Sequence, residues 1–121
     1  MNWFPYLLLV VVFALFWLIR RAGLVSEREA IELLRKGGVL LDVRTAGEFV
    51  AGHLAGAVNL PLNEIETQIT RRAEARDQVL LLHCQSGARS GMACKKLKAM
   101  GYLHVFNLGS YARAASILGR R

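Results

Sequence analysis

The sequence predicts an α/β fold, in which helices flank a parallel sheet, preceded by one apolar helix. Short apolar runs bounded by turn residues, typical of buried strands, occur at residues 39–43 and 79–82. Segments with helical periodicity alternate with these runs, and that alternation is typical of parallel sheets. The first nineteen residues carry no charged side chain, although the whole chain has a net charge of +7. We therefore divide the chain into an anchor, residues 1–21, and one small domain, residues 22–121.

The apolar segment, residues 3–19, reads WFPYLLLVVVFALFWLI and would be about 26 Å long as a helix. That length is at the short end of what crosses a bilayer, and tryptophan or tyrosine near both ends suits the two interfaces. A cleaved signal peptide would begin with basic residues, whereas here Arg20-Arg21 stand where cleavage should occur. A buried core helix would show polar positions on one face. Because the basic residues follow the segment, we predict a single-pass transmembrane anchor with the C-terminal domain facing the cytoplasm.

The elements of the domain follow in chain order. A capping-box pattern, Ser26 to Glu29, begins a helix that runs to about Arg35, and Gly37-Gly38 ends it. After the strand at 39–43, a short helix passes through residues 48–50 and ends at Gly52. The rest predicts a short strand at 57–60, a helix from 63 to about 75, the strand at 79–82, a helix at 88–100, a strand at 105–108 and a closing helix at 111–118.

The candidate functional site lies between the strand at 79–82 and the helix at 88–100. Cys84 would stand at the C-terminal end of a buried strand, where ligands bind in open α/β sheets. Unpaired N–H groups at a helix N-terminus stabilise an anion such as a thiolate, and Arg89 adds a permanent cation. Gly87 allows the loop to curl. The alternative is that Cys84 is only a buried residue at the end of a strand.

The excess of positive charge limits the kinds of molecule that the domain is expected to bind. Basic clusters occur at Arg20-Arg21, Arg71-Arg72, Lys95-Lys96-Lys98 and Arg120-Arg121, but aromatic residues are not interleaved with them. We therefore predict no nucleic-acid binding, and favour anionic lipid headgroups at a membrane or small anionic substrates. The two cysteines form no disulfide framework, and no Cys/His spacing is typical of a zinc site. We predict no bound metal.

Two motifs resemble a known family. The first is similar to the DVR-x-x-x-EF-x-x-GH-I-x-GA-x-N-x-P pattern of rhodanese-like domains and consists of Leu41-Asp42-Val43-Arg44, Glu48-Phe49, Gly52-His53-Leu54, Gly56-Ala57, Asn59 and Pro61. The second resembles the active-site loop of that family and its small-residue helix, and consists of Cys84-Gln85-Ser86-Gly87-Ala88-Arg89-Ser90 followed by Ala93, Cys94 and Leu97. The resemblance covers residues 24–118, nearly the whole domain.

The resemblance implies a rhodanese-type sulfurtransferase built on a five-stranded parallel sheet, with no cofactor. It implies that Cys84 is the nucleophile, which accepts a sulfane sulfur as a persulfide. The backbone amides of Gln85, Ser86, Gly87, Ala88 and Arg89 would cradle that sulfur. Arg89 would also bind a small anionic donor such as thiosulfate, and the sulfur would pass to cyanide, to a thiol or to a partner protein.

The length of the loop after Cys84 and the sequence after the last predicted strand refine this hypothesis. Four residues separate Cys84 from Arg89, as in sulfurtransferases of the family, whereas related phosphatases have five. Many members have two glycines after the last strand and a tryptophan soon after, but here the chain reads Leu108-Gly109-Ser110-Tyr111. This departure leaves the pocket shape and the acceptor open. The alternative function is a non-catalytic sulfur-relay or partner-binding module at the membrane.

Four further residues of the motifs, and His83 before the second motif, receive supporting roles. Arg44 is predicted to be a structural ion-pair partner, and Glu48 and His53 are predicted to hold loops. His83 precedes the nucleophile on the strand, so its side chain should point away from the loop. Cys94 is predicted to pack in the core, because a redox role would require it to approach Cys84 within bonding reach.

Overall fold

In the computed structural model, which describes residues 2–119 apart from the side chains of residues 20–22, four parallel strands form one sheet. The strands are β1 (Val39–Asp42), β2 (Val58–Asn59), β3 (Val79–His83) and β4 (His104–Gly109), in the order β2-β1-β3-β4. The α/β class and all four predicted strands are confirmed. Of the predicted basic clusters, Arg120-Arg121 lies outside the described residues, as do the side chains of Arg20-Arg21.

The fifth strand that the resemblance implied is a single bridge in this chain. Leu24 pairs in parallel with Asn107 beside β4, and the N–H of Val25 donates to the carbonyl of Asn107 at 3.0 Å. The next residue, Ser26, already caps the following helix by accepting a hydrogen bond from the N–H of Glu29. Because the helix begins at once, the segment does not extend into a strand.

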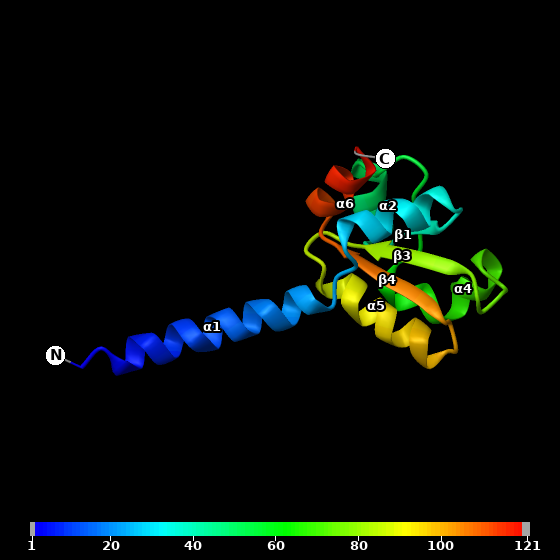
Figure 1. Ribbon diagram of the computed structural model, residues 1–121. Helices are drawn as coiled ribbons and strands as arrows, with labels where there is room; N and C mark the ends of the chain where they lie inside the picture. The colour runs from blue at the N-terminus through cyan, green and yellow to red at the C-terminus, as the bar shows by residue number, and fades with distance from the viewer. Residues whose placement is uncertain (1, 120–121) are drawn as a thin grey trace.

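Helices cover both faces of the sheet (Figure 1). On one face α2 (Glu27–Arg35) packs with α6 (Tyr111–Leu118), and on the other α4 (Ile65–Arg72) packs with α5 (Ala88–Ala99). Side chains of a strand alternate between faces, so Leu80 and Leu82 join the core under α4 and α5, whereas Leu81 joins the core under α2 and α6. Two short helices, α3 (Ala46–Ala51) and η1 (Leu62–Glu64), lie in the connections around β2.

The helix predicted from residue 63 to about 75 differs from the observed one. It begins as the 3-10 turn η1 and ends at Arg72, because Ala73 has an extended backbone and is buried. The hydroxyl of Tyr102 donates to the carbonyl of Ala73 at 2.6 Å, and this bond fixes the end of the helix against the connection between α5 and β4.

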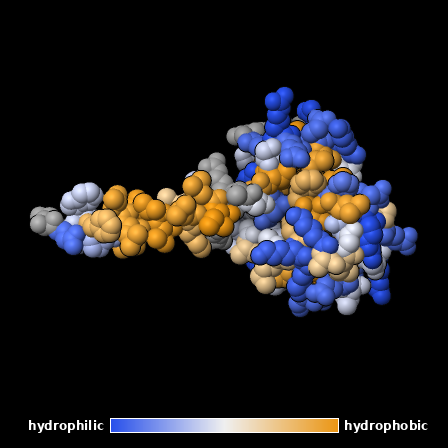
Figure 2. Space-filling model, turned by 60° about the horizontal axis from the view of Figure 1, so that its bottom comes forward, coloured by the Kyte–Doolittle hydropathy of each residue, from blue (hydrophilic) through white to orange (hydrophobic). Residues whose placement is uncertain are grey.

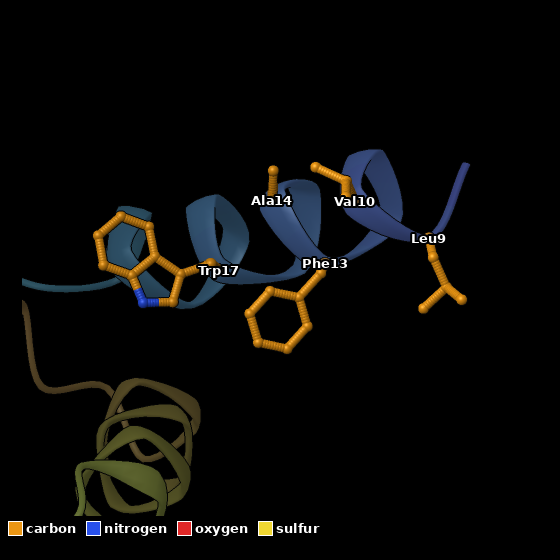
Figure 3. Close-up of a pocket in the computed structure, with 5 residues that line it drawn as sticks. All are labelled: Leu9, Val10, Phe13, Ala14 and Trp17. Carbon is orange, nitrogen blue, oxygen red and sulfur yellow. The ribbon is translucent and has the colours of Figure 1, made fainter. Parts of the chain in front are cut away.

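The first helix, α1 (Phe4–Ala22), projects from the domain (Figure 1). Its apolar side chains are exposed along its length, and they form the most hydrophobic part of the surface in Figure 2. Leu9 and Phe13 project to one side of this helix, and Val10 and Ala14 to the other (Figure 3). Among the described residues, no helix has both the length and the apolar character needed to cross a membrane. The predicted transmembrane anchor over residues 1–21 is therefore not supported by the structure.

Candidate active site

Cys84 directly follows β3 and lies beneath the loop that leads into α5. Its side chain is fully buried, and its backbone N–H donates to the carbonyl of Gly109 on β4 at 3.2 Å. The N–H of Gly87 donates to the sulfur of Cys84 at 2.9 Å. The sulfur therefore faces backbone donors at the N-terminus of a helix, as the sequence predicted.

The surroundings of Cys84 act on its pKa in opposite directions. Burial alone would raise the pKa of this thiol, because burial disfavours the charged form. The N–H and hydroxyl of Ser90 and the N–H groups of Gly87 and Ser86 outweigh burial and hold the pKa of Cys84 below its ordinary value. A lower pKa raises the fraction of nucleophilic thiolate at neutral pH. Cys84 thus has the environment of a reactive thiol.

Gly87 is required by the path of the loop. Its φ is +97°, in a region that L side chains rarely adopt. A Cβ at this position would lie 3.3 Å from the backbone of Gly109, which belongs to the neighbouring strand β4. The loop therefore passes so close to β4 that a side chain at residue 87 would push against the backbone of Gly109, and on this path the N–H of Gly87 reaches the sulfur.

Asn107 and Ser90 tie the loop to the sheet. The side-chain oxygen of Asn107 lies 2.7 Å from the hydroxyl of Ser90 and accepts the N–H of Gly109 at 2.9 Å. Ser90 itself is fully buried in the first turn of α5. Sequence reasoning did not assign Asn107 to the site, although a polar residue within an apolar strand was a usable signal.

The remaining loop residues lie around the buried sulfur. Gln85 and Ser86 are exposed, and the carbonyl of Gln85 accepts the N–H of Tyr111 at 3.3 Å. Ala88 is exposed and begins α5. A cleft of about 820 Å³ borders this side of the loop, with walls from Leu24 before α2 and from the basic face of α5, and its lining includes Trp17, Ser86, Gly87, Ala88, Lys95 and Lys98.

Both arginines next to the loop are paired with carboxylates. Arg89 donates to the two carboxylate oxygens of Glu48, at 2.6 Å from Nη1 and 3.0 Å from Nη2. Arg44 likewise donates to both oxygens of the buried Asp42, at 2.7 Å from Nη2 to Oδ2 and at 3.0 Å from Nε to Oδ1. Arg44 is the structural ion-pair partner that the sequence predicted. Arg89, the predicted donor-binding residue, is itself held in an ion pair by Glu48.

Cys94, His53 and His83 make none of these contacts with the loop. Cys94 lies on the buried face of α5, and burial raises the pKa of its thiol to about 12. Both cysteines are free thiols. His83 is fully buried beside the edge of Tyr111, and burial lowers its pKa, so the ring is neutral at pH 7. His53 stacks on Phe49 with ring centroids 3.8 Å apart, which fixes the loop after α3.

Within residues 2–119 as described, no group of three or more His, Cys, Asp or Glu residues is placed to hold a metal ion. The loop itself offers a thiolate with backbone donors and two paired guanidinium groups. Such a site can attack a sulfur atom and hold the negatively charged product at the helix N-terminus.

The family model of the rhodanese-like domain matches residues 26–113 of the chain. The chain belongs to the rhodanese-like domain family. Thiosulfate sulfurtransferase 18 of Arabidopsis thaliana is 40% identical over 98 residues, which cover 70% of this chain and 71% of that protein. Thiosulfate sulfurtransferase PspE of Escherichia coli is 35% identical over 69 residues, which cover 57% of this chain and 66% of that protein.

A solved rhodanese-like structure shows the same fold. The human single-domain sulfurtransferase TSTD1 superposes with a TM-score of 0.66 at 30% sequence identity, over 78% of this chain and 96% of that one. The described domain is thus a single rhodanese-like domain, and the family match at residues 26–113 includes the whole Cys84 loop. The match begins after α1, so it does not bear on the apolar helix.

Proposed function

We propose that this chain is a sulfurtransferase that carries a sulfane sulfur on Cys84, from a donor such as thiosulfate to cyanide or a thiol. The observation that carries the proposal is the contact between the sulfur of Cys84 and the N–H of Gly87 at the start of α5. This donor, with those of Ser90 and Ser86, favours the thiolate that the reaction needs. Relatives named thiosulfate sulfurtransferases in two organisms support the same chemistry.

The reaction divides into two displacements at sulfur. In the first, the Cys84 thiolate attacks the outer sulfur of thiosulfate, the S–S bond breaks, and sulfite leaves with the electron pair. The new terminal sulfur of the Cys84 persulfide carries the negative charge, which the backbone N–H groups of the loop stabilise. In the second, cyanide or a thiolate attacks this terminal sulfur and releases the Cys84 thiolate. Thiocyanate or a new persulfide leaves, and no electrons enter or are lost.

Steady-state transfer of sulfur from thiosulfate to cyanide tests the proposal on the full chain. We expect thiocyanate formation by the wild-type protein and none above background by Cys84→Ser. Cys94→Ala is the matched control, because its thiol is buried and protonated at neutral pH, and it should keep the wild-type rate. Loading of sulfur on Cys84 without turnover would point to the sulfur-relay module, whose acceptor is a protein.

We also propose that α1 attaches the domain to a membrane, with the domain on the cytoplasmic side. The support is the exposed apolar surface of α1, with Tyr6 72% and Phe13 69% exposed, followed by the basic residues of the domain. Co-flotation of the full chain with vesicles that contain one quarter phosphatidylglycerol should be lost when residues 2–19 are deleted. Labelling of Asn2→Cys, in a chain without its two native cysteines, by an impermeant maleimide from each side tests the orientation.

A further inference from the structure

The carboxylate of Glu48 places a negative charge beside the Cys84 loop. Both of its oxygens are bound by Arg89, and the two side chains are each one third exposed. Pairing of a planar guanidinium with both oxygens of a carboxylate is the strong form of this bond. Together, the hydrogen bond from Arg89 and bonds from Thr45 hold the pKa of Glu48 at about 2, so it is ionised in the whole working range.

The start of α3 fixes Glu48 in this position. The backbone N–H and the hydroxyl of Thr45 both donate to Oε1 of Glu48 at 3.1 Å, and Oγ1 of Thr45 accepts the N–H of Glu48. This is a complete capping box, in which the helix start and the carboxylate hold each other. The carboxylate is therefore oriented toward Arg89 by its own helix before any donor arrives.

The guanidinium of Arg89 lies within electrostatic reach of the nucleophile. Its pKa is raised first by the hydrogen bond with Glu48, and the charge of the Cys84 thiolate raises it further. Arg44, the other arginine at the loop, is matched by the buried Asp42. Each of these two arginines is thus neutralised by a carboxylate, and among the described residues the unmatched positive charge near the loop lies on Lys95 and Lys98 in the adjoining cleft.

We propose that Glu48 is a specificity-determining residue that disfavours doubly charged sulfur donors by occupying the guanidinium of Arg89. This inference rests on the proposed function. A dianion such as thiosulfate must displace the carboxylate from Arg89 or lie beside it, and either costs free energy. A singly charged donor meets less repulsion. Glu48 therefore shifts the donor preference of the site toward low charge.

Two donors that differ by one charge test this directly. Thiosulfate is a dianion, whereas methanethiosulfonate is a monoanion: the Cys84 thiolate attacks its outer sulfur, the S–S bond breaks and methanesulfinate leaves with the electron pair. Transfer to cyanide is measured with both donors, for the full wild-type chain and for Glu48→Gln. Glutamine keeps an oxygen that can accept the bonds from Thr45, so the substitution removes the charge and retains the helix start.

We expect Glu48→Gln to lower KM for thiosulfate by about five- to tenfold, with kcat within about twofold of wild type. For methanethiosulfonate we expect KM to fall by no more than about threefold. Glu66→Gln is the matched control, because it makes the same change of charge in another ion pair, with Lys96 at 3.1 Å. It should leave both KM values unchanged. In Glu48→Gln combined with Arg89→Gln, the gain for thiosulfate should disappear.

An equal change for both donors, or a higher KM for thiosulfate in Glu48→Gln, would overturn the inference and leave Glu48 with the role of orienting Arg89. Thermal unfolding of each variant shows whether the loop has lost its fold. Intact mass after incubation with each donor separates the two proposals. Absence of sulfur on wild-type Cys84 with both donors would contradict the proposed function itself, whereas loading by both donors without donor discrimination by Glu48 would contradict only this inference.

Discussion

Replacement of Gly87 by alanine perturbs the loop at its tightest point. The φ of +97° is strained for any residue with a Cβ, and the new methyl carbon would lie 3.3 Å from two backbone atoms of Gly109. Those atoms have little freedom, because Gly109 pairs with His83 in the sheet and itself has a φ of +91°. The conformational strain and the overpacking together should lower the free energy of unfolding by about 2–4 kcal/mol.

The same substitution should destabilise the thiolate form of Cys84. The N–H of Gly87 contacts the sulfur of Cys84 only because the backbone follows this path. When the methyl group moves the loop away from β4, that donor moves with it, and the pKa of Cys84 should rise. Urea unfolding measures the loss of stability, and the rate of alkylation by iodoacetamide as a function of pH measures the change in the thiol.

Gly47→Ala is the control for this experiment. Gly47 lies in α3, and a Cβ there would meet no atom within 4 Å. This substitution should stabilise the fold by about 0.5–1 kcal/mol and leave alkylation of Cys84 unchanged. If Gly87→Ala unfolds within about 0.5 kcal/mol of wild type and alkylates with the same pH profile, the reasoning on the loop is wrong.

Three other substitutions give separate tests. Ser90→Ala removes a hydroxyl that lowers the pKa of Cys84, so the alkylation profile should move to higher pH and the rate at pH 7 should fall severalfold. Asp42→Asn leaves the buried guanidinium of Arg44 without its charge partner, and urea unfolding should show a loss of about 3–5 kcal/mol. Cys94→Ala should leave the alkylation of Cys84 unchanged, because the pKa of Cys94 is raised to about 12; a second fast-reacting thiol in the native wild-type protein would contradict this.

Local patterns predicted most of the fold, because each pattern depends on neighbours in the chain. The apolar run at 79–82 forms β3. The loop that follows it and the helix α5 also agree with the predicted order of strand, loop and helix. The predicted capping residue Ser26 begins α2. The edge of the sheet was less predictable, since the pairing of Leu24 with Asn107 depends on where α2 begins relative to β4.

The sequence predicted the position of the nucleophile, but it did not predict which charged side chains of the site pair with each other. Cys84 could be placed from the strand before it and the glycine after it. The pairing of Arg89 with Glu48 joins residues 41 positions apart, and it depends on how α3 is placed over the start of α5. Asn107 likewise reaches the loop from β4, the strand beside β3. Contacts of this kind follow from tertiary packing, and no local pattern specifies them.

Intact mass of the full wild-type chain after incubation with thiosulfate is the most direct test of the central claim, that Cys84 carries the transferred sulfur. We predict a gain of one sulfur atom that cyanide removes, with thiocyanate released in equal amount. Cys84→Ser should gain nothing, and Cys94→Ala should gain the same single sulfur as wild type. A sulfur that remains in Cys84→Ser, or that is absent from the wild-type chain, would contradict the claim.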